Sequence, residues 1–207
     1  MDSAYTTHLI KDKKLARVLK EQEPLVLKRK ENLFLSICSS IISQQLSTKV
    51  AQVIYKRFLG LYDVEEPSPE IVLGTSVETL RSIGLSNAKA AYVRNVAQFA
   101  IDRGIDIHQL DQKTDEEIIQ YLTEIKGVGR WTVEMLLMFT FAREDIFAPD
   151  DLGIQNAMIR LYKVSRDDKN TFRANMLRIS NKWKPYRTYA CLHLWHWKDN
   201  VPLVIKS

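Results

Sequence analysis

Apolar residues recur at spacings of three and four along almost the whole of this 207-residue chain. That spacing follows the α-helical period of 3.6 residues, whereas the alternation of apolar and polar residues that marks a half-buried strand is scarce. The periodic segments are joined by short connections, as in compact helical folds. The pattern therefore predicts an all-α protein with no internal repeat and no long disordered linker.

Capping residues predict where several of these helices begin and end. Thr75–Glu78 and Thr114–Glu117 both have the pattern of a capping box, in which a Thr or Ser side chain and a Glu three residues later bind each other's backbone. Ser86 is expected to cap a helix that ends at Gly104. Residues 31–59 are expected to form one long helix or two short ones, and further helices are expected over residues 12–22, 131–141, 151–162, 168–182 and 185–197.

The same sequence excludes several classes of protein. No apolar run approaches the ~18 residues that a membrane-spanning helix needs. The N-terminus lacks the basic and then apolar layout of a secretory signal. Two cysteines, Cys38 and Cys191, cannot form a disulfide framework or supply four thiolates to a zinc ion or an iron–sulfur cluster. We therefore expect a cytoplasmic protein without a membrane anchor or an iron–sulfur cofactor.

The chain carries a small excess of positive charge, with 30 Lys and Arg against 25 Asp and Glu and a net charge of +5. Such a balance is compatible with a nucleic-acid partner but does not require one. Lys89, Lys182, Lys184 and Arg187 are interpreted as solvated surface charges that attract phosphates collectively. If the partner is DNA, its affinity for the chain should fall steeply with salt.

The most specific stretch is Leu122–Met135, in which a Gly-Val-Gly turn separates two predicted helices. Glycines let backbone N–H groups approach an external group closely, and the start of the next helix attracts negative charge. The alternative is an ordinary corner between two helices with glycine caps. The residues expected to bind a phosphate are Lys126, Gly127, Gly129, Arg130 and Thr132.

Residues Ile125–Thr132, followed by a loop with Pro149 and then Asp151, resemble the helix–hairpin–helix/Gly-Pro-Asp DNA glycosylases. The resemblance is closest to the 3-methyladenine DNA glycosylase II branch, and it extends roughly from Leu33 to Trp197. It implies two helical lobes with a DNA-binding cleft between them, without the extra N-terminal domain of larger members.

The resemblance also suggests how this fold is divided along the chain. We expect residues 1–207 to form a single glycosylase unit built from two lobes. Residues 31–110 would form the first lobe, whereas residues 1–30 and 165–207 would pack with a hairpin lobe over residues 111–164. A monomer that binds double-stranded DNA is expected, associated with the nucleoid if the source is bacterial.

By this resemblance Asp151 is the expected catalytic residue. A carboxylate at the start of a helix is favoured in its ionised form, and it could stabilise an oxocarbenium-like sugar and orient water at the anomeric carbon. The alternative is that Asp150 and Asp151 only cap the helix. Asp150 is the weaker catalytic candidate and suits the capping role.

The position after Arg130 distinguishes two reaction types among these enzymes. Bifunctional relatives have a lysine there, whose amine forms a Schiff base with the sugar and enables strand cleavage. This chain has Trp131, so the resemblance implies a monofunctional glycosylase that leaves an abasic site. The expected substrates are cationic purines such as 3-methyladenine and 7-methylguanine, which an indole face attracts.

Trp195 matches a second aromatic residue of the family's base pocket, although both tryptophans could instead belong to the core. Met135 and Leu152 stand where some relatives have tyrosines, which makes the expected pocket more aliphatic. A glycosylase for another lesion, or a helix–hairpin–helix module that binds DNA without cutting it, remains the alternative function.

Two further features follow from the resemblance. Gln45 matches the residue that fills the stack when a base is flipped out, and Leu46 is the near alternative; Gln44 and Gln45 could instead bridge backbone groups at a helix end. The backbone carbonyls of Thr123, Ile125 and Val128 could hold a structural monovalent cation at the hairpin.

Overall fold

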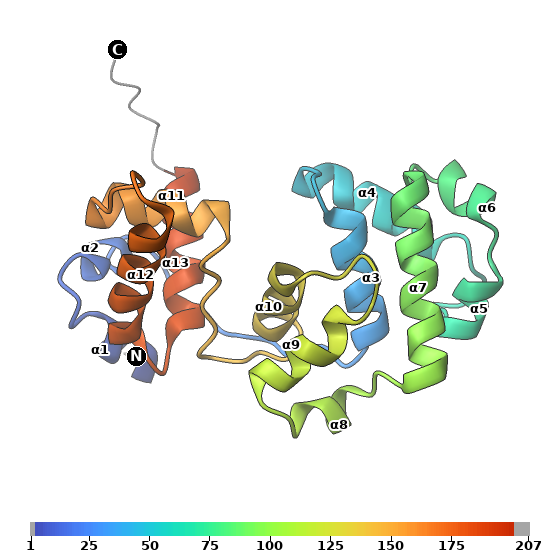
Figure 1. Cartoon of the computed structure of the whole chain (residues 1–207), viewed down its shortest axis with the longest axis horizontal. Helices are drawn as coiled ribbons and strands as arrows, with labels where there is room; N and C mark the ends of the chain where they lie inside the picture. The colour runs from blue at the N-terminus through green and yellow to red at the C-terminus, as the bar shows by residue number, and fades with distance from the viewer. Residues whose placement is uncertain (1–2, 201–207) are drawn as a thin grey trace, which may run out of the picture. The chain divides into compact units, whose positions relative to one another are not determined.

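The computed structural model describes residues 3–200, with side chains to Lys198, and every regular element in this part of the chain is a helix (Figure 1). The all-α prediction is therefore confirmed. The chain divides into two compact units. One unit consists of Arg29–Phe141, and the other combines the described residues up to Lys28 with those from Ala142 onward.

This division differs from the expected lobes, because residues 111–141 belong to the same unit as residues 29–110. The physical reason is that α10 (Arg130–Phe139) packs against both α9 (Asp115–Thr123) and α3 (Leu33–Ser43). The backbone N–H of Lys30 also donates to the carbonyl of Thr140 at 2.9 Å. The hairpin is thus built into the unit that begins at Arg29.

In the unit Arg29–Phe141, α7 (Asn87–Arg103) packs against α3 and α5 (Pro69–Gly74), as Figure 1 shows. The apolar side chains of α3 are buried, including Ile37, Cys38 and Ile41. The expected helical segment 31–59 forms two helices. The remaining helices of this unit are α4 (Thr48–Leu59), α5 (Pro69–Gly74), α6 (Val77–Ser82), α7 (Asn87–Arg103) and α8 (Ile107–Asp111).

The predicted caps of this unit are confirmed at two helices and wrong at a third. Ser86 caps α7, which ends before Gly104, and Thr114 forms the predicted capping box with Glu117. The cap of α6 is Ser76, whose hydroxyl accepts from the N–H of Thr79 at 3.1 Å. Thr75 cannot serve there because it ends α5 and donates its hydroxyl to the carbonyl of Ile71.

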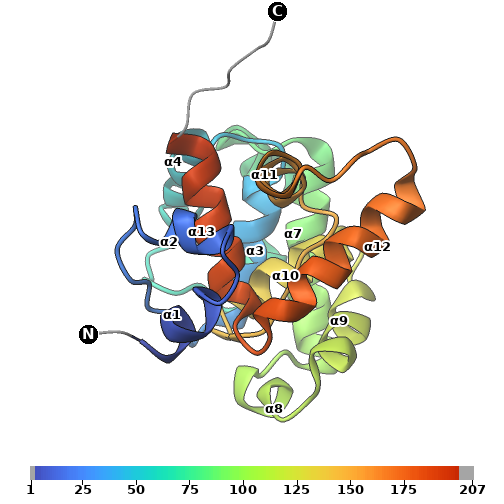
Figure 2. The same cartoon turned by 90° about the vertical axis from the view of Figure 1, so that its left-hand side faces the viewer.

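The second unit is centred on α13 (Arg187–Asn200), which packs against α11 (Leu152–Tyr162) and α2 (Leu15–Leu19); Figure 2 draws these helices in a second view. The expected helix over residues 12–22 is shorter than predicted. Asp12 accepts from the N–H groups of Lys14 and Leu15, and the chain turns there. The elements are α1 (Ala4–Leu9), α2 (Leu15–Leu19), α11 (Leu152–Tyr162), α12 (Lys169–Ser180), a 3-10 helix (Asn181–Trp183) and α13 (Arg187–Asn200).

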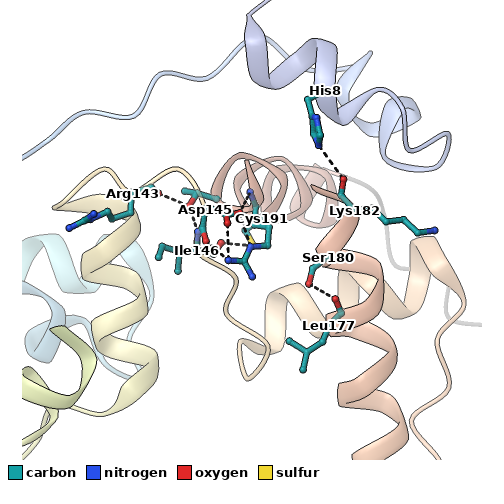
Figure 3. Close-up of polar contacts among 10 residues, drawn as sticks. His8, Arg143, Asp145, Ile146, Leu177, Ser180, Lys182 and Cys191 are labelled. Atoms are coloured by element: carbon teal, nitrogen blue, oxygen red, sulfur yellow. Dashed lines mark hydrogen bonds and ion pairs between the residues drawn. The ribbon is translucent and has the colours of Figure 1, made fainter. Parts of the chain in front are cut away.

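The segment that leads to Asp151 is tied to the start of α13. The hydroxyl of Thr188 accepts from the N–H of Ile146 at 3.0 Å, and the Arg187 guanidinium pairs with the Asp145 carboxylate at 2.7 Å. Figure 3 shows Asp145, Ile146 and Cys191 gathered at this junction. Arg187 therefore forms an ion pair within the unit. The interpretation of Arg187 as a solvated surface charge is wrong.

Contacts between distant segments also hold α1 in this unit. The His8 ring lies 3.2 Å from the carbonyl of Lys182, as drawn in Figure 3. Tyr5 stacks on Tyr189 with 4.0 Å between the ring centroids. Trp183 is fully buried and donates its indole N–H to Asp12 at 3.2 Å. These contacts build a second core around α13.

His193 on α13 gives this core a pH dependence. Its side chain is 1% exposed, with Nδ1 2.9 Å from Oε1 of Gln22 and Nε2 3.3 Å from the hydroxyl of Tyr5. Burial, with a smaller effect of His196, lowers the pKa of His193 to about 4 from the usual 6.5. Below pH 6.5 the unfolded chain therefore binds a proton that the folded chain excludes.

We expect the stability that neutral His193 contributes to be complete above pH 6.5 and to be lost as the pH falls toward 4. The loss from this one group should approach about 1.4 kcal/mol per pH unit within that window. Urea unfolding at pH 7, 5.5 and 4.5 measures the free energy of unfolding for the wild type and for His193→Gln. The variant should be less stable at pH 7 and less sensitive to acid; equal pH slopes would contradict the assignment.

Candidate active site

The turn between α9 and α10 has the geometry of a tight hairpin. Gly127 has φ +107°, which disfavours any residue with a side chain. A Cβ added to Gly127 would also lie 2.7 Å from the Cβ of Tyr92. By contrast, a Cβ added to Gly129 would meet nothing within 4 Å. Gly127 is therefore required for packing inside the unit, whereas Gly129 leaves open space at the start of α10.

The basic and hydroxyl residues around this turn differ in how available they are to a phosphate. The side chain of Lys126 is exposed, and Thr132 is buried. The Arg130 guanidinium donates to both carboxylate oxygens of Glu116, at 3.0 and 2.8 Å, and to Glu134 at 3.2 Å. Glu116 raises the pKa of Arg130, and Arg130 lowers the pKa of Glu116. A phosphate at Arg130 would have to compete with these carboxylates.

The segment after α3 separates the roles of the two neighbouring glutamines. Gln44 donates its side-chain amide to the carbonyl of Gly127 at 3.2 Å and so connects this segment to the hairpin. Gln45 is exposed and has φ +58°, an uncommon conformation for a residue with a side chain. Leu46 beside it is also exposed. The backbone-bridging alternative thus describes Gln44, while Gln45 and Leu46 present their side chains to solvent.

A cavity of about 610 Å³ lies between α3 and α10 in the unit Arg29–Phe141. It brings together four residues that the sequence analysis assigned to the base pocket or the wedge. On α10 the lining includes Trp131 and Met135, and at the end of α3 it includes Gln45 and Leu46. Such a volume suits a heterocyclic base, since small-molecule pockets begin at roughly 300 Å³.

One side of this cavity is lined by serines that were not predicted from the sequence to belong to the site. Four serines on α3, spaced three and four residues apart, line it: Ser36, Ser39, Ser40 and Ser43. The hydroxyl of Ser36 donates to the carbonyl of Asn32, and that of Ser43 donates to the carbonyl of Ser39. Their spacing could have predicted this surface, because serines three and four residues apart on an otherwise apolar helix lie on one face.

The described residues that line this cavity include no carboxylate, and Lys30 is their one charged member. Apart from Lys30, the polar side chains that line the cavity carry hydroxyls and amides, and its apolar lining includes Trp131, Met135 and Phe139. Trp131 is 42% exposed, which places the indole at the surface and excludes the core alternative for this residue.

Asp151 is the N-cap of α11. Its Oδ1 accepts from the N–H of Ile154 at 2.8 Å and from the indole Nε1–H of Trp195 at 2.7 Å. The residue is 9% exposed. The idea that Asp150 caps the helix is wrong, because the Asp150 carboxylate pairs with the guanidinium of Arg173 on α12. The N-cap of α11 is therefore Asp151, the residue that the resemblance names as catalytic.

The approach of Trp195 to this carboxylate depends on Gly153. A Cβ at that position would lie 2.8 Å from Cδ1 of Trp195, 2.9 Å from its Nε1 and 3.0 Å from Oδ1 of Asp151. The neighbouring Leu152 is 62% exposed. Trp195 therefore contacts the expected catalytic group directly, a role that the sequence did not indicate.

The candidate site residues thus fall into two groups, one on each compact unit. Trp131, Met135, Gln45, Leu46 and the hairpin belong to Arg29–Phe141, whereas the carboxylate group belongs to the unit that contains α11 and α13. The carboxylate group consists of Asp151, Leu152 and Trp195.

The expected cation site follows the end of α9 at Thr123. Carbonyls there point out of the helix at the negative end of its dipole, which is a suitable environment for a cation. The carbonyl of Ile125 accepts from the N–H of Val128 at 2.9 Å, so one of its two lone pairs is already used. Within residues 3–198, no group of three or more His, Cys, Asp or Glu side chains could hold a metal ion.

Comparison with known proteins gives this arrangement a context. The model of the HhH-GPD superfamily of base excision DNA repair proteins matches residues 38–183, which include the hairpin and Asp151. This chain belongs to that superfamily.

Among the helices that the structure describes, none is long and apolar enough to span a membrane.

Individual relatives are similar over most of the chain. DNA-3-methyladenine glycosylase 1 of Schizosaccharomyces pombe is 31% identical, covering 88% of this chain and 80% of that protein. A solved DNA-3-methyladenine glycosidase from Bacillus halodurans has 33% identity and a TM-score of 0.82, covering 96% of this chain and 91% of its own. The S. pombe 3-methyladenine DNA glycosylase, solved in complex with abasic DNA, has a TM-score of 0.81 and 30% identity, covering 93% of this chain and 95% of its own.

Proposed function

We propose that this chain is a monofunctional DNA glycosylase that excises alkylated, cationic purines such as 3-methyladenine and 7-methylguanine and leaves an abasic site. The carrying observation is the Asp151 carboxylate, which the N–H of Ile154 and the indole of Trp195 hold at the start of α11. Similarity to 3-methyladenine glycosylases over most of the chain supports the substrate class.

In the proposed reaction the bond between C1′ of the sugar and the nitrogen of the base breaks. Its electron pair goes to the base, which neutralises the positive charge that alkylation introduced. The Asp151 carboxylate stabilises the positive charge that develops on the sugar, as preorganised charge does in other enzymes. Water then adds its oxygen to C1′ and releases one proton. Because the leaving base is already cationic, a strong general acid is not needed.

The cavity between α3 and α10 is the proposed base pocket. Trp131 would stack on the base, and an indole face attracts a cation by roughly 0.5–2 kcal/mol. Met135 would supply apolar contacts, and Gln45 or Leu46 would fill the space that the flipped base leaves in the duplex. Trp131 carries no amine, so a Schiff-base intermediate and strand cleavage are not expected.

The backbone of the hairpin is the proposed phosphate site, through the N–H groups near Gly127 and Gly129 at the start of α10. Lys126 would add an exposed positive charge, while Arg130 and the buried Thr132 would contribute less directly. A monovalent cation on the carbonyls of Thr123, Ile125 and Val128 would raise the positive potential further. We also infer a monomer, because one chain supplies both the carboxylate and the stacking residues, and a cytoplasmic location where chromosomal DNA is accessible.

The test is base release from duplex DNA that contains 3-methyladenine or 7-methylguanine, with the product analysed with and without alkali. We expect free base, and strand breaks only after alkali, because an abasic site resists cleavage until base treatment. Breaks without alkali would overturn the monofunctional assignment. Salt-sensitive DNA binding without release of either base would favour a different lesion or a non-catalytic module.

A further inference from the structure

The ammonium group of Lys89 closes the end of the helix that precedes the proposed wedge. Nζ of Lys89, on the first turns of α7, donates to the carbonyl of Ile42 at 2.8 Å and to that of Gln44 at 2.6 Å. These carbonyls stand at the C-terminal end of α3, where intrahelical donors are missing and the dipole is negative. The residue that follows them is Gln45.

This contact contradicts the interpretation of Lys89 as a solvated charge. The side chain is half-buried, and burial lowers its pKa. Both carbonyls are within hydrogen-bond distance, so the ammonium is directed into the protein and is not presented to a phosphate. The sequence could not predict this hydrogen bond, because Lys89 and Gln44 are 45 residues apart.

The same helix also holds the hairpin. The ring of Tyr92, one turn after Lys89, lies against Gly127, and the Asn95 amide donates to the carbonyl of Lys126 at 3.1 Å. Gln44 connects the two loops directly through its bond to the carbonyl of Gly127. One face of α7 therefore supports both the segment that carries Gln45 and the turn proposed to bind phosphate.

The conformation of Gln45 makes such support necessary. Its φ of +58° is unfavourable for a residue with a Cβ and persists only where neighbouring contacts impose it. The N–H of Leu46 donates to the carbonyl of Ser43 at 3.1 Å, which closes the turn on one side. Lys89 holds the carbonyl of Gln44 on the other side, immediately before the strained residue.

We propose that Lys89 is a positioning residue that fixes the Gln45–Leu46 wedge relative to the hairpin by binding the carbonyls of Ile42 and Gln44. The proposal rests on the function proposed above, in which Gln45 or Leu46 replaces a flipped base. It assigns Lys89 to base extrusion and not to the general affinity for DNA.

Lys89→Met tests this assignment, because it keeps the length of the side chain and removes the ammonium. We expect single-turnover release of 3-methyladenine from a paired duplex to fall roughly 10-fold or more, since misplacement of a positioning group is costly. Release from a single-nucleotide bulge, where the lesion is already unpaired, should fall less than about 2-fold, because extrusion costs less there. Lys89→Arg, which keeps the donors, should recover part of the paired-duplex rate.

The competing role, a phosphate contact, is separated by binding to lesion-free duplex at several salt concentrations. A lost phosphate contact would reduce the dependence of log K on log salt by about 0.9. We expect no such change for Lys89→Met, and its affinity for lesion-free DNA should match that of Lys56→Met. Lys56 is an exposed lysine on α4, so its variant controls for the loss of one charge.

A reduced salt slope, an equal loss on paired and bulged substrates, or an unchanged paired-duplex rate would overturn the proposal. Fluorescence of 2-aminopurine in a duplex reports base extrusion even if no base is released. If the wild-type chain extrudes this base but excises none, the proposed function fails while Lys89 remains testable by the same signal. Gln44→Met, which removes the second tether, provides an independent variant if Lys89→Met does not fold.

Discussion

Replacing Asp151 with asparagine is expected to lower base release at least about 100-fold, the usual effect of removing one group that stabilises transition-state charge. The fold should survive, because asparagine is among the best N-cap residues. Its side-chain oxygen can still accept from the N–H of Ile154 and the indole of Trp195, as Oδ1 of Asp151 does. The substitution therefore removes the negative charge and little else.

The measurement is single-turnover release of 3-methyladenine, together with affinity for a duplex that contains an abasic-site analogue. Binding should change little or rise slightly, since a carboxylate repels phosphates. Asp150→Asn is the matched control: it breaks an exposed ion pair with Arg173, and such pairs contribute about 0–1 kcal/mol. Undiminished release by Asp151→Asn would mean that Asp151 only caps α11.

Gly153→Ala is expected to separate Trp195 from Asp151. The added Cβ would lie 2.8 Å from Cδ1 and 2.9 Å from Nε1 of Trp195, distances that force the indole to move. The carboxylate would then lose the 2.7 Å hydrogen bond that orients it. A shift of about 1 Å in a catalytic group can reduce the rate roughly 100-fold, so we expect a loss approaching that of Asp151→Asn.

The same substitution should destabilise the protein by about 1–3 kcal/mol through overpacking. In general, replacing a glycine within a helix by alanine stabilises a protein by about 0.5–1 kcal/mol. At Gly153 we expect the opposite effect, because the added Cβ has no room. Gly74→Ala provides the control, because Gly74 ends α5 and a Cβ there meets nothing within 4 Å. For Gly74→Ala we expect a thermal unfolding midpoint equal to or higher than that of the wild type, and an unchanged rate of base release. Full activity in Gly153→Ala would show that the contact between Trp195 and Asp151 does not orient the carboxylate.

The sequence by itself determined the features that depend on neighbours three or four residues away. The capping box of Thr114 with Glu117, the cap at Ser86 and the stop at Gly104 are all local, and all three were predicted correctly. The apolar period predicted helices throughout, and the Gly-Val-Gly turn indicated the hairpin. Thr75 shows the limit of such signals, since two adjacent hydroxyl residues compete for a cap and only the end of α5 decides between them.

Only the tertiary structure decided which partner each side chain takes from a distant segment. Lys89 binds carbonyls 45 and 47 residues away, Trp195 reaches Asp151 across 44 residues, and Arg130 pairs with Glu116 on the preceding helix. None of these partners was predicted from the sequence, which suggested solvent for Lys89, a phosphate for Arg130 and a base pocket for Trp195. The physical reason is that helix caps and apolar periods arise from contacts within one turn, whereas the partner of a long polar side chain depends on how separate helices pack.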